Sequence, residues 1–79
     1  MRYELVVPST ADGSLAVTIA TWIKDVGSPV VAGEDLVEAT TEKITLYVVA
    51  PANGTLAEII APVGSMVDVG TVIGIVEGV

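Results

Sequence analysis

A single lysine between two β-type runs is the first candidate for chemistry in this sequence. Residues 36–50 are rich in Val and Thr, and the two runs meet at Glu42 and Lys43. Lys43 is one of only three Lys and Arg residues in the 79-residue chain. A primary amine held in an exposed turn can form an amide with an activated carboxyl group, and acylation removes its positive charge. A lone lysine in a turn is ordinarily a solvated charge, so modification by another enzyme is a hypothesis that depends on the flanking residues.

The composition argues against most other kinds of catalysis. The chain has no histidine and no cysteine, so it lacks the usual general base at neutral pH, the commonest metal ligand and any thiol nucleophile. We interpret its acidic side chains as a solvated surface, not as a metal site; among them are Asp25, Glu34, Asp35 and Glu38. We predict a domain with no catalytic residue and no metal of its own.

Charge and hydropathy limit the possible partners and the possible cellular locations of the chain. The net charge of −7 disfavours nucleic acid and anionic membrane surfaces, because both would repel the chain. Every apolar run is interrupted far short of the roughly 20 residues that span a bilayer. The first residues lack the features of a secretory signal, and the absence of cysteine fits a reducing compartment. We expect proteins as partners and a cytoplasmic location, or the mitochondrial matrix for a mature eukaryotic chain.

The turn residues predict an all-β domain without a helix. β-Branched residues dominate, and Gly or Pro recurs too often for an apolar stripe of helical length. Eight strands are predicted, over residues 3–7, 15–23, 30–31, 36–41, 44–50, 55–61, 66–67 and 71–77. We interpret four glycines as turn residues and the one tryptophan as a packing residue: Gly27, Gly33, Gly64, Gly70 and Trp22.

The chain consists of two similar halves. Residues 13–20, Gly-Ser-Leu-Ala-Val-Thr-Ile-Ala, resemble residues 54–61, Gly-Thr-Leu-Ala-Glu-Ile-Ile-Ala, and residues 26–33 resemble residues 63–70. This alignment places four extra residues of the first half around 21–24. Two halves of about four short strands each would bury their apolar faces against one another. We predict a flattened barrel or sandwich of two roughly four-stranded antiparallel sheets with a pseudo-two-fold repeat, a barrel-sandwich hybrid.

The repeat also predicts where Lys43 lies. Its turn joins the two halves, so the counterpart of that turn is the gap between the two chain ends. Lys43 should therefore lie at the end of the domain opposite both termini. The strand at 3–7 starts beside the termini and should deliver the next loop to the Lys43 end, where we expect it to contact partner proteins. This loop consists of Ser9, Thr10, Ala11 and Asp12.

The segment around the lysine resembles a known family. Residues 37–44, Val-Glu-Ala-Thr-Thr-Glu-Lys-Ile, are similar to the modification hairpin of lipoyl domains, typically Val-Glu-x-Glu-Thr-Asp-Lys-Ala or -Val. The resemblance extends over nearly the whole chain, to the family's Trp-x-x-x-x-Gly, Gly-Asp-x-Leu, Ala-Pro-x-x-Gly and Val-Gly segments. They correspond to residues 22–27, 33–36, 50–54 and 69–70. Three positions depart from the pattern: Thr40, Glu42 and Ile44.

The resemblance implies a function for the hairpin. Residues 1–79 would form a single non-catalytic carrier domain, part of a dihydrolipoamide acyltransferase chain in a 2-oxo acid dehydrogenase complex or, given the Glu-Lys-Ile turn, an acetoin dehydrogenase complex. Lys43 would carry lipoate as a covalent amide, with Thr41, Glu42 and Ile44 recognised around it. The implied partners are a lipoate-attaching ligase or transferase, a thiamine diphosphate-dependent dehydrogenase, an acyltransferase core and the flavoprotein dihydrolipoamide dehydrogenase.

Two other functions fit the same architecture. A biotinyl carrier domain of a biotin-dependent carboxylase has a lysine at the same tip, but typically within Glu-Ala-Met-Lys-Met. Glu42 and Ile44 occupy the two Met positions, so lipoate is favoured. An unmodified lipoyl-like module serving structure or interaction, as in efflux adaptor proteins, normally has no matching lysine.

Overall fold

The computed structural model describes residues 1–10 and 13–78 and consists of β strands and turns. The strands are β1 (Arg2–Val6), β2 (Ala16–Trp22), β3 (Pro29–Val30), β4 (Asp35–Thr40), β5 (Thr45–Val49), β6 (Gly54–Ile59), β7 (Met66–Asp68) and β8 (Val72–Gly78). All eight predicted strands are confirmed, each with ends within two residues of the predicted ones. In the described part of the chain, no helix is long and apolar enough to cross a membrane.

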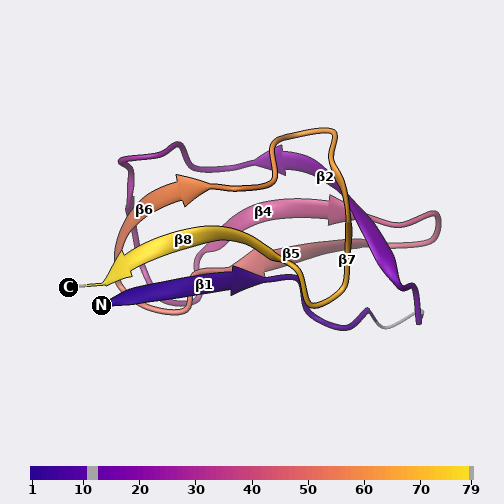
Figure 1. The fold of residues 1–79 in the computed structure, drawn as a ribbon, viewed down its shortest axis with the longest axis horizontal. Helices are drawn as coiled ribbons and strands as arrows, with labels where there is room; N and C mark the ends of the chain where they lie inside the picture. The colour runs from indigo at the N-terminus through magenta and orange to yellow at the C-terminus, as the bar shows by residue number, and fades with distance from the viewer. Residues whose placement is uncertain (11–12, 79) are drawn as a thin grey trace.

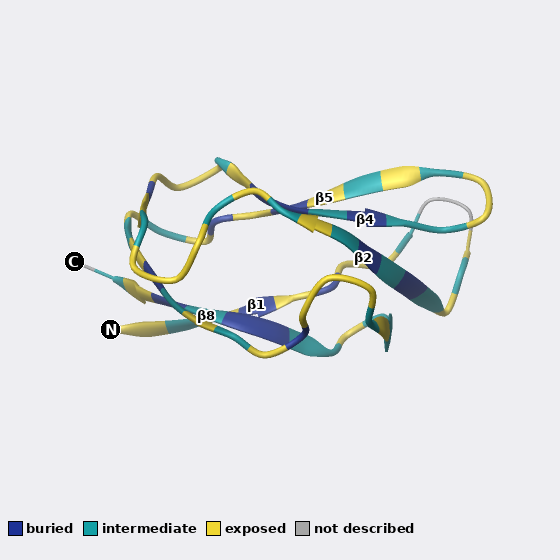
Figure 2. Cartoon of the chain, turned by 90° about the horizontal axis from the view of Figure 1, so that it is seen from above, coloured by how far each residue is buried: buried dark blue, intermediate teal, exposed yellow. Residues whose placement is uncertain are grey.

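Two four-stranded antiparallel sheets form the domain. Their strand orders are β1-β8-β6-β3 and β5-β4-β2-β7, and Figure 2 shows them as two layers, with β4 and β5 in one and β1 and β8 in the other. Alternate residues of the strands are buried between the layers, so the core is built from Val, Leu, Ile and Ala. Its largest fully buried side chains include Leu5, Ile19, Leu36, Leu56 and Ile73. The predicted all-β sandwich is confirmed, and within the described residues the sheets do not close into a barrel.

A pseudo-two-fold relates the two sheets. Replacing β1, β2, β3 and β4 by β5, β6, β7 and β8, and the reverse, converts one strand order into the other. The pairing registers agree, since Ile19 lies opposite Ala39 in the first half and Leu56 lies opposite Val76 in the second. Each sheet takes two strands from each half. The predicted repeat is confirmed, but the halves interlock instead of forming one sheet each.

The extra residues of the first half do not lie where the sequence alignment placed them. The pairing registers make Val17 the equivalent of Gly54, so the alignment of Gly13 with Gly54 is wrong by four residues. Ten residues, 7–16, connect Val6 to Val17, whereas four residues, 50–53, connect the equivalent Val49 to Gly54. The insertion therefore belongs to the β1–β2 connection and not to residues 21–24.

The chain ends and the β4–β5 turn lie at opposite ends of the domain. Figure 1 shows both termini together at the left and the β4–β5 turn at the far right. β1 pairs with β8 at the termini, with Arg2 opposite Glu77, as β5 pairs with β4 in the other sheet. The predicted position of Lys43, opposite both termini, is confirmed.

Equivalent glycines form the tight turns of the two halves. Gly27 and Gly64 each have a φ of 93°, in the left-handed region that favours glycine. The Gly27 N–H donates to the Leu56 carbonyl oxygen, and the Gly64 N–H donates to the Ile19 carbonyl oxygen, both at 2.8 Å. These bonds attach each turn to a core strand of the other half. The interpretation of these glycines as turn residues is confirmed.

Trp22 at the end of β2 is a packing residue, as predicted. It packs against the core, and its Nε1 donates to the Ala61 carbonyl oxygen at 2.7 Å. Trp22→Phe keeps an aromatic ring but removes the donor, so we expect the free energy of unfolding to fall by about 1–2 kcal/mol. Circular dichroism should show a lower melting temperature, by roughly 4–8 °C per kcal/mol.

The half-exposed Tyr47 provides the matched control for this aromatic change. Tyr47→Phe also removes one polar hydrogen, and we expect it to leave the melting temperature nearly unchanged. Equal melting temperatures for Trp22→Phe and the unmodified sequence would contradict the stabilising role of the indole hydrogen bond.

Candidate functional site

A side chain holds the backbone of the β4–β5 turn. Thr40 and Thr45 are the last paired residues of the hairpin, and beyond them the Thr41 N–H donates to the Ile44 carbonyl oxygen at 2.8 Å. The Thr41 Oγ1 accepts hydrogen bonds from the N–H groups of Lys43 and Ile44, each at 3.1 Å. One hydroxyl therefore satisfies two amides at the tip and fixes the backbone on which the lysine side chain is mounted.

Thr41→Val retains the β-branched shape but removes this acceptor. We expect the free energy of unfolding to fall by about 1–2 kcal/mol, because two N–H groups lose their protein partner. Hydrogen exchange followed by NMR should be faster at the amides of Lys43 and Ile44. Thr41→Ser keeps the hydroxyl and should retain slow exchange; equal exchange in the Val and Ser variants would show that the hydroxyl does not hold the turn.

The Lys43 side chain is exposed and lies apart from the ion pairs of the domain. The Arg2 guanidinium lies 3.4 Å from the Glu77 carboxylate, and the Lys24 Nζ lies 3.6 Å from the Glu34 carboxylate. Among the residues that the structure describes, Lys43 takes part in no ion pair. Its amine is therefore accessible to another protein.

No catalytic group of the domain itself is apparent around this amine. Across residues 1–10 and 13–78, no group of three or more acidic, His or Cys side chains forms a candidate metal site. The sequence also supplies no histidine or cysteine to act on the lysine. The arrangement can therefore present an amine to another protein.

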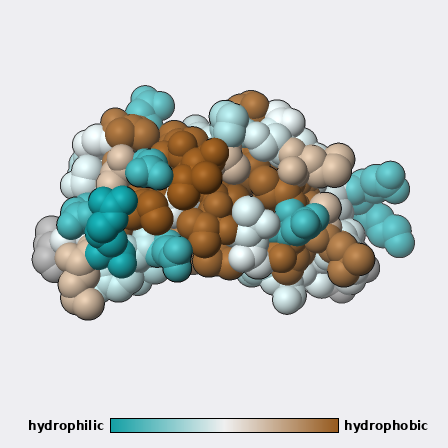
Figure 3. Space-filling model, in the orientation of Figure 1, coloured by the Kyte–Doolittle hydropathy of each residue, from teal (hydrophilic) through white to brown (hydrophobic). Residues whose placement is uncertain are grey.

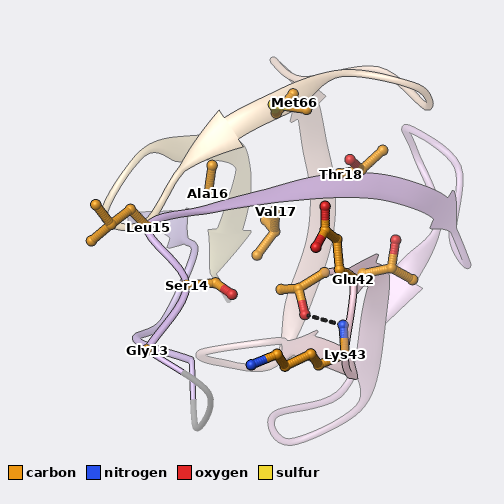
Figure 4. Close-up of a pocket in the computed structure, with 11 residues that line it drawn as sticks. Gly13, Ser14, Leu15, Ala16, Val17, Thr18, Glu42, Lys43 and Met66 are labelled. Carbon is orange, nitrogen blue, oxygen red and sulfur yellow. Dashed lines mark hydrogen bonds between the residues drawn. The ribbon is translucent and has the colours of Figure 1, made fainter.

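An open hollow of about 730 Å³ lies beside the turn. Its walls are formed by residues 13–18, residues 40–43 and Met66. Figure 4 shows the Lys43 side chain extending toward Gly13, which lies in the second half of the β1–β2 connection. The end of the enlarged connection and the lysine therefore lie side by side.

The predicted site residues fall into three groups. Thr41, Glu42 and Lys43 line the hollow, whereas Ile44 is half-buried next to the turn. Ser9 and Thr10 lie in the β1–β2 connection, where the Thr10 Oγ1 donates to the Ser14 carbonyl oxygen at 3.1 Å. The other two predicted loop residues, Ala11 and Asp12, lie outside the described residues.

Most residues that line the hollow were not predicted from the sequence as site residues, and two of them are large apolar side chains on the surface. Leu15 and Met66 are 83% and 75% exposed, although both are large and apolar. Each directly follows a Gly-Ser pair, at 13–14 and 64–65. A large apolar residue placed straight after a turn pair is the signal that could have identified them.

Comparisons with known proteins identify the family. The family model Biotin_lipoyl, described as biotin-requiring enzyme, matches residues 1–76. The solved lipoyl domain of the 2-oxoglutarate dehydrogenase complex from Azotobacter vinelandii is 33% identical, with a TM-score of 0.73 over 95% of this chain and 96% of that chain. The chain therefore belongs to the family of biotinyl and lipoyl attachment domains. Within this family it is a lipoyl carrier domain, and the biotinyl alternative is not supported.

Two further similarities define the scope of this assignment. The dihydrolipoyllysine-residue succinyltransferase component of the 2-oxoglutarate dehydrogenase complex from Rickettsia conorii is 45% identical over 74 residues, which are 94% of this chain but 19% of that protein. The chain thus spans about a fifth of such relatives. Urea carboxylase from Kluyveromyces lactis has a TM-score of 0.83 and is 19% identical, over 98% of this chain and 6% of the urea carboxylase chain. At this identity the similarity shows the fold alone.

The family assignment also determines the cofactor. Lipoyl domains of these acyltransferase components carry lipoate covalently on a lysine, so the predicted cofactor is confirmed. The exposed tip, with a lysine amine apart from the ion pairs of the described residues, fits such an attachment.

Proposed function

We propose that Lys43 carries lipoate and that the domain shuttles acyl groups and reducing equivalents within a 2-oxo acid dehydrogenase complex. The observation that carries this proposal is the exposed Lys43 at the tip of the β4–β5 turn, opposite both termini. The other two amines each lie near a carboxylate, since the Lys24 Nζ is 3.6 Å from Glu34 and the terminal amine is 4.0 Å from Glu77.

The residues of the turn present the amine for attachment. A ligase activates the carboxyl group of lipoate; the Lys43 nitrogen then forms the amide bond, a proton leaves the nitrogen, and the activating group departs. Thr41 keeps the backbone of the tip ordered during this reaction through its two accepted hydrogen bonds. When attached, lipoate supplies a dithiolane that accepts an acyl group and reducing equivalents.

The proposed partners are the enzymes that the arm visits. They are a lipoate-attaching ligase or transferase, a thiamine diphosphate-dependent dehydrogenase, an acyltransferase core and dihydrolipoamide dehydrogenase. Relatives named as succinyltransferase components make 2-oxoglutarate the leading substrate candidate for the parent complex. Tethering raises the effective concentration of the arm at each active site, so weak docking is sufficient.

Intact mass spectrometry tests the attachment. The chain is expressed with a lipoate ligase and lipoate, or with a biotin ligase and biotin. We expect the mass of one lipoyl group in the first case and no addition in the second. A biotin adduct, or an unmodified mass in both cases, would overturn the proposal.

Reductive acylation tests the substrate. The lipoylated domain is incubated with the dehydrogenase component for 2-oxoglutarate, for pyruvate or for acetoin, each with its own substrate. We expect the mass of a succinyl group to appear fastest with the 2-oxoglutarate enzyme. Faster acylation by either of the other enzymes would assign the domain to that complex instead.

The same assay tests the role of the β1–β2 connection. Its described residues Ser9 and Thr10 precede the segment that lies beside Lys43, and we propose that the connection contacts the dehydrogenase. Replacing both residues by Gly should slow reductive acylation without reducing lipoylation. An unchanged rate of acylation would remove these two residues from the proposed contact surface.

A further inference from the structure

The hollow beside the turn contains the proposed attachment residue in its own wall. Lys43 lines it together with residues 13–18 and Met66. A group attached to Lys43 therefore remains within reach of the hollow at high effective concentration, and even a weak contact is populated. The volume of about 730 Å³ lies within the range of small-molecule sites, roughly 300–1,000 Å³.

The hollow also offers apolar surface that is exposed to water. Leu15 and Met66, both in its wall, are more exposed than every other large apolar side chain of the described residues except Met1. Figure 3 shows the polar tip of the hairpin projecting at the right of the domain. Covering such side chains with an apolar group is favourable because it removes apolar area from water.

Modification itself makes the arm suitable for this surface. Amide formation removes the charge of Lys43, so the attached arm is an uncharged chain with an apolar ring at its end. Glu42 remains the charged residue of the wall among the described residues, and Figure 4 shows it pointing toward β2. A neutral arm can extend toward Leu15 and Met66 without bringing a second charge close to this carboxylate.

The repeat shows that this end of the domain is specialised. The connection that ends in the wall of the hollow has ten residues, 7–16, and its equivalent in the other half has four, 50–53. The position of Met66 corresponds to Pro29 in the other half, because Met66 pairs with Thr18 as Pro29 pairs with Thr55. The longer connection and the Met side chain both lie where Lys43 lies.

We propose that the hollow is the resting site of the lipoyl group on Lys43, with Leu15 and Met66 covering the dithiolane ring. The proposal rests on the proposed attachment at Lys43. Between visits to partner enzymes, the arm lies folded against its own domain, and the disulfide of the ring is shielded from solvent. Docking of a partner then competes with this contact for the arm.

Methyl NMR tests the contact directly. Spectra are compared for the unmodified domain, the lipoylated domain and Lys43→Gln, in which the charge is lost without an arm. We expect shifts of the Leu15 and Met66 methyl signals in the lipoylated domain that Lys43→Gln does not reproduce and that persist on dilution. Identical Leu15 and Met66 signals in the lipoylated domain and in Lys43→Gln would overturn the proposal.

The rate of ring reduction provides a second readout. A water-soluble phosphine reduces the S–S bond to two thiols, with water supplying the protons and the oxygen of the phosphine oxide. In lipoylated Leu15→Ala/Met66→Ala we expect reduction about threefold faster than in the parent domain, because the resting contact is weakened. Val26→Ala/Val31→Ala removes two side chains that are 56% and 61% exposed and do not line the hollow, and it should leave the rate unchanged.

Intact mass measured first separates this proposal from the proposed function. Samples without a lipoyl group would contradict the attachment itself. Fully lipoylated samples in which both double variants are reduced at the parent rate would contradict the resting site alone.

Discussion

We expect the Lys43→Arg substitution to abolish lipoylation. Arginine keeps the positive charge and a long side chain, but its guanidinium stays protonated and does not form the amide. Intact mass after expression with a lipoate ligase should show no adduct, and reductive acylation should fall to background. The free energy of unfolding should change by no more than roughly 0.5 kcal/mol, because the side chain is exposed. The melting temperature should therefore be nearly unchanged.

Lys24→Arg is the matched control for this change. Lys24 is paired with Glu34 away from the turn, and Arg preserves the charge of that pair. We expect complete lipoylation of this variant. Loss of the adduct in Lys24→Arg, or its persistence in Lys43→Arg, would contradict the assignment of Lys43.

Leu56→Ala is expected to have the largest effect on stability. Leu56 is fully buried in β6, opposite Val76, and truncation of such a leucine costs about 2–5 kcal/mol through lost burial and a residual cavity. A small domain has a stability of about 5–15 kcal/mol, so the loss is a large part of the total. Thermal unfolding should show a melting temperature lower by roughly 4–8 °C per kcal/mol.

Leu15→Ala is the chemically identical control at an exposed position. Its side chain is 83% exposed, so the expected loss is within about 0.5 kcal/mol. Similar losses in the two variants would contradict the core derived for the two sheets.

The eight strands could be predicted because turn residues mark their ends. Gly27, Gly33, Gly64 and Gly70 all have positive φ, a conformation in which glycine is strongly preferred. Alternation of apolar residues then assigned one face of each strand to the core. Together with the repeat, this was sufficient to place Lys43 opposite the termini.

The position of the insertion could not be derived from the same pattern. Matching Gly13 with Gly54 shifts the second strand by four residues, and an even shift leaves the inward and outward faces of a strand unchanged. Both alignments therefore bury the same kinds of residue. Only the hydrogen-bonded register, with Pro29 opposite Thr55 and Met66 opposite Thr18, distinguishes them.

The hollow could not be predicted from the sequence either. It depends on how the β1–β2 connection approaches the β4–β5 turn, and these segments are separated along the chain by the three strands β2, β3 and β4. Leu15 and Met66 appear as ordinary core residues in a hydrophobicity pattern. Met66 lies opposite Thr18, which alternates with the buried Val17 and Ile19, so its side chain is on the outer face of the sheet. Leu15 immediately precedes β2 and is exposed there.

The most direct test of the central claim is to locate the lipoyl group in the modified domain by tandem mass spectrometry of its proteolytic peptides. The scaffold presents one amine at a turn tip, while Lys24 and the terminal amine serve as internal alternatives in the same sample. We predict the lipoyl mass on the fragment that contains Lys43 and on no other. A lipoyl group on Lys24 or on the amino terminus, with Lys43 unmodified, would contradict the account.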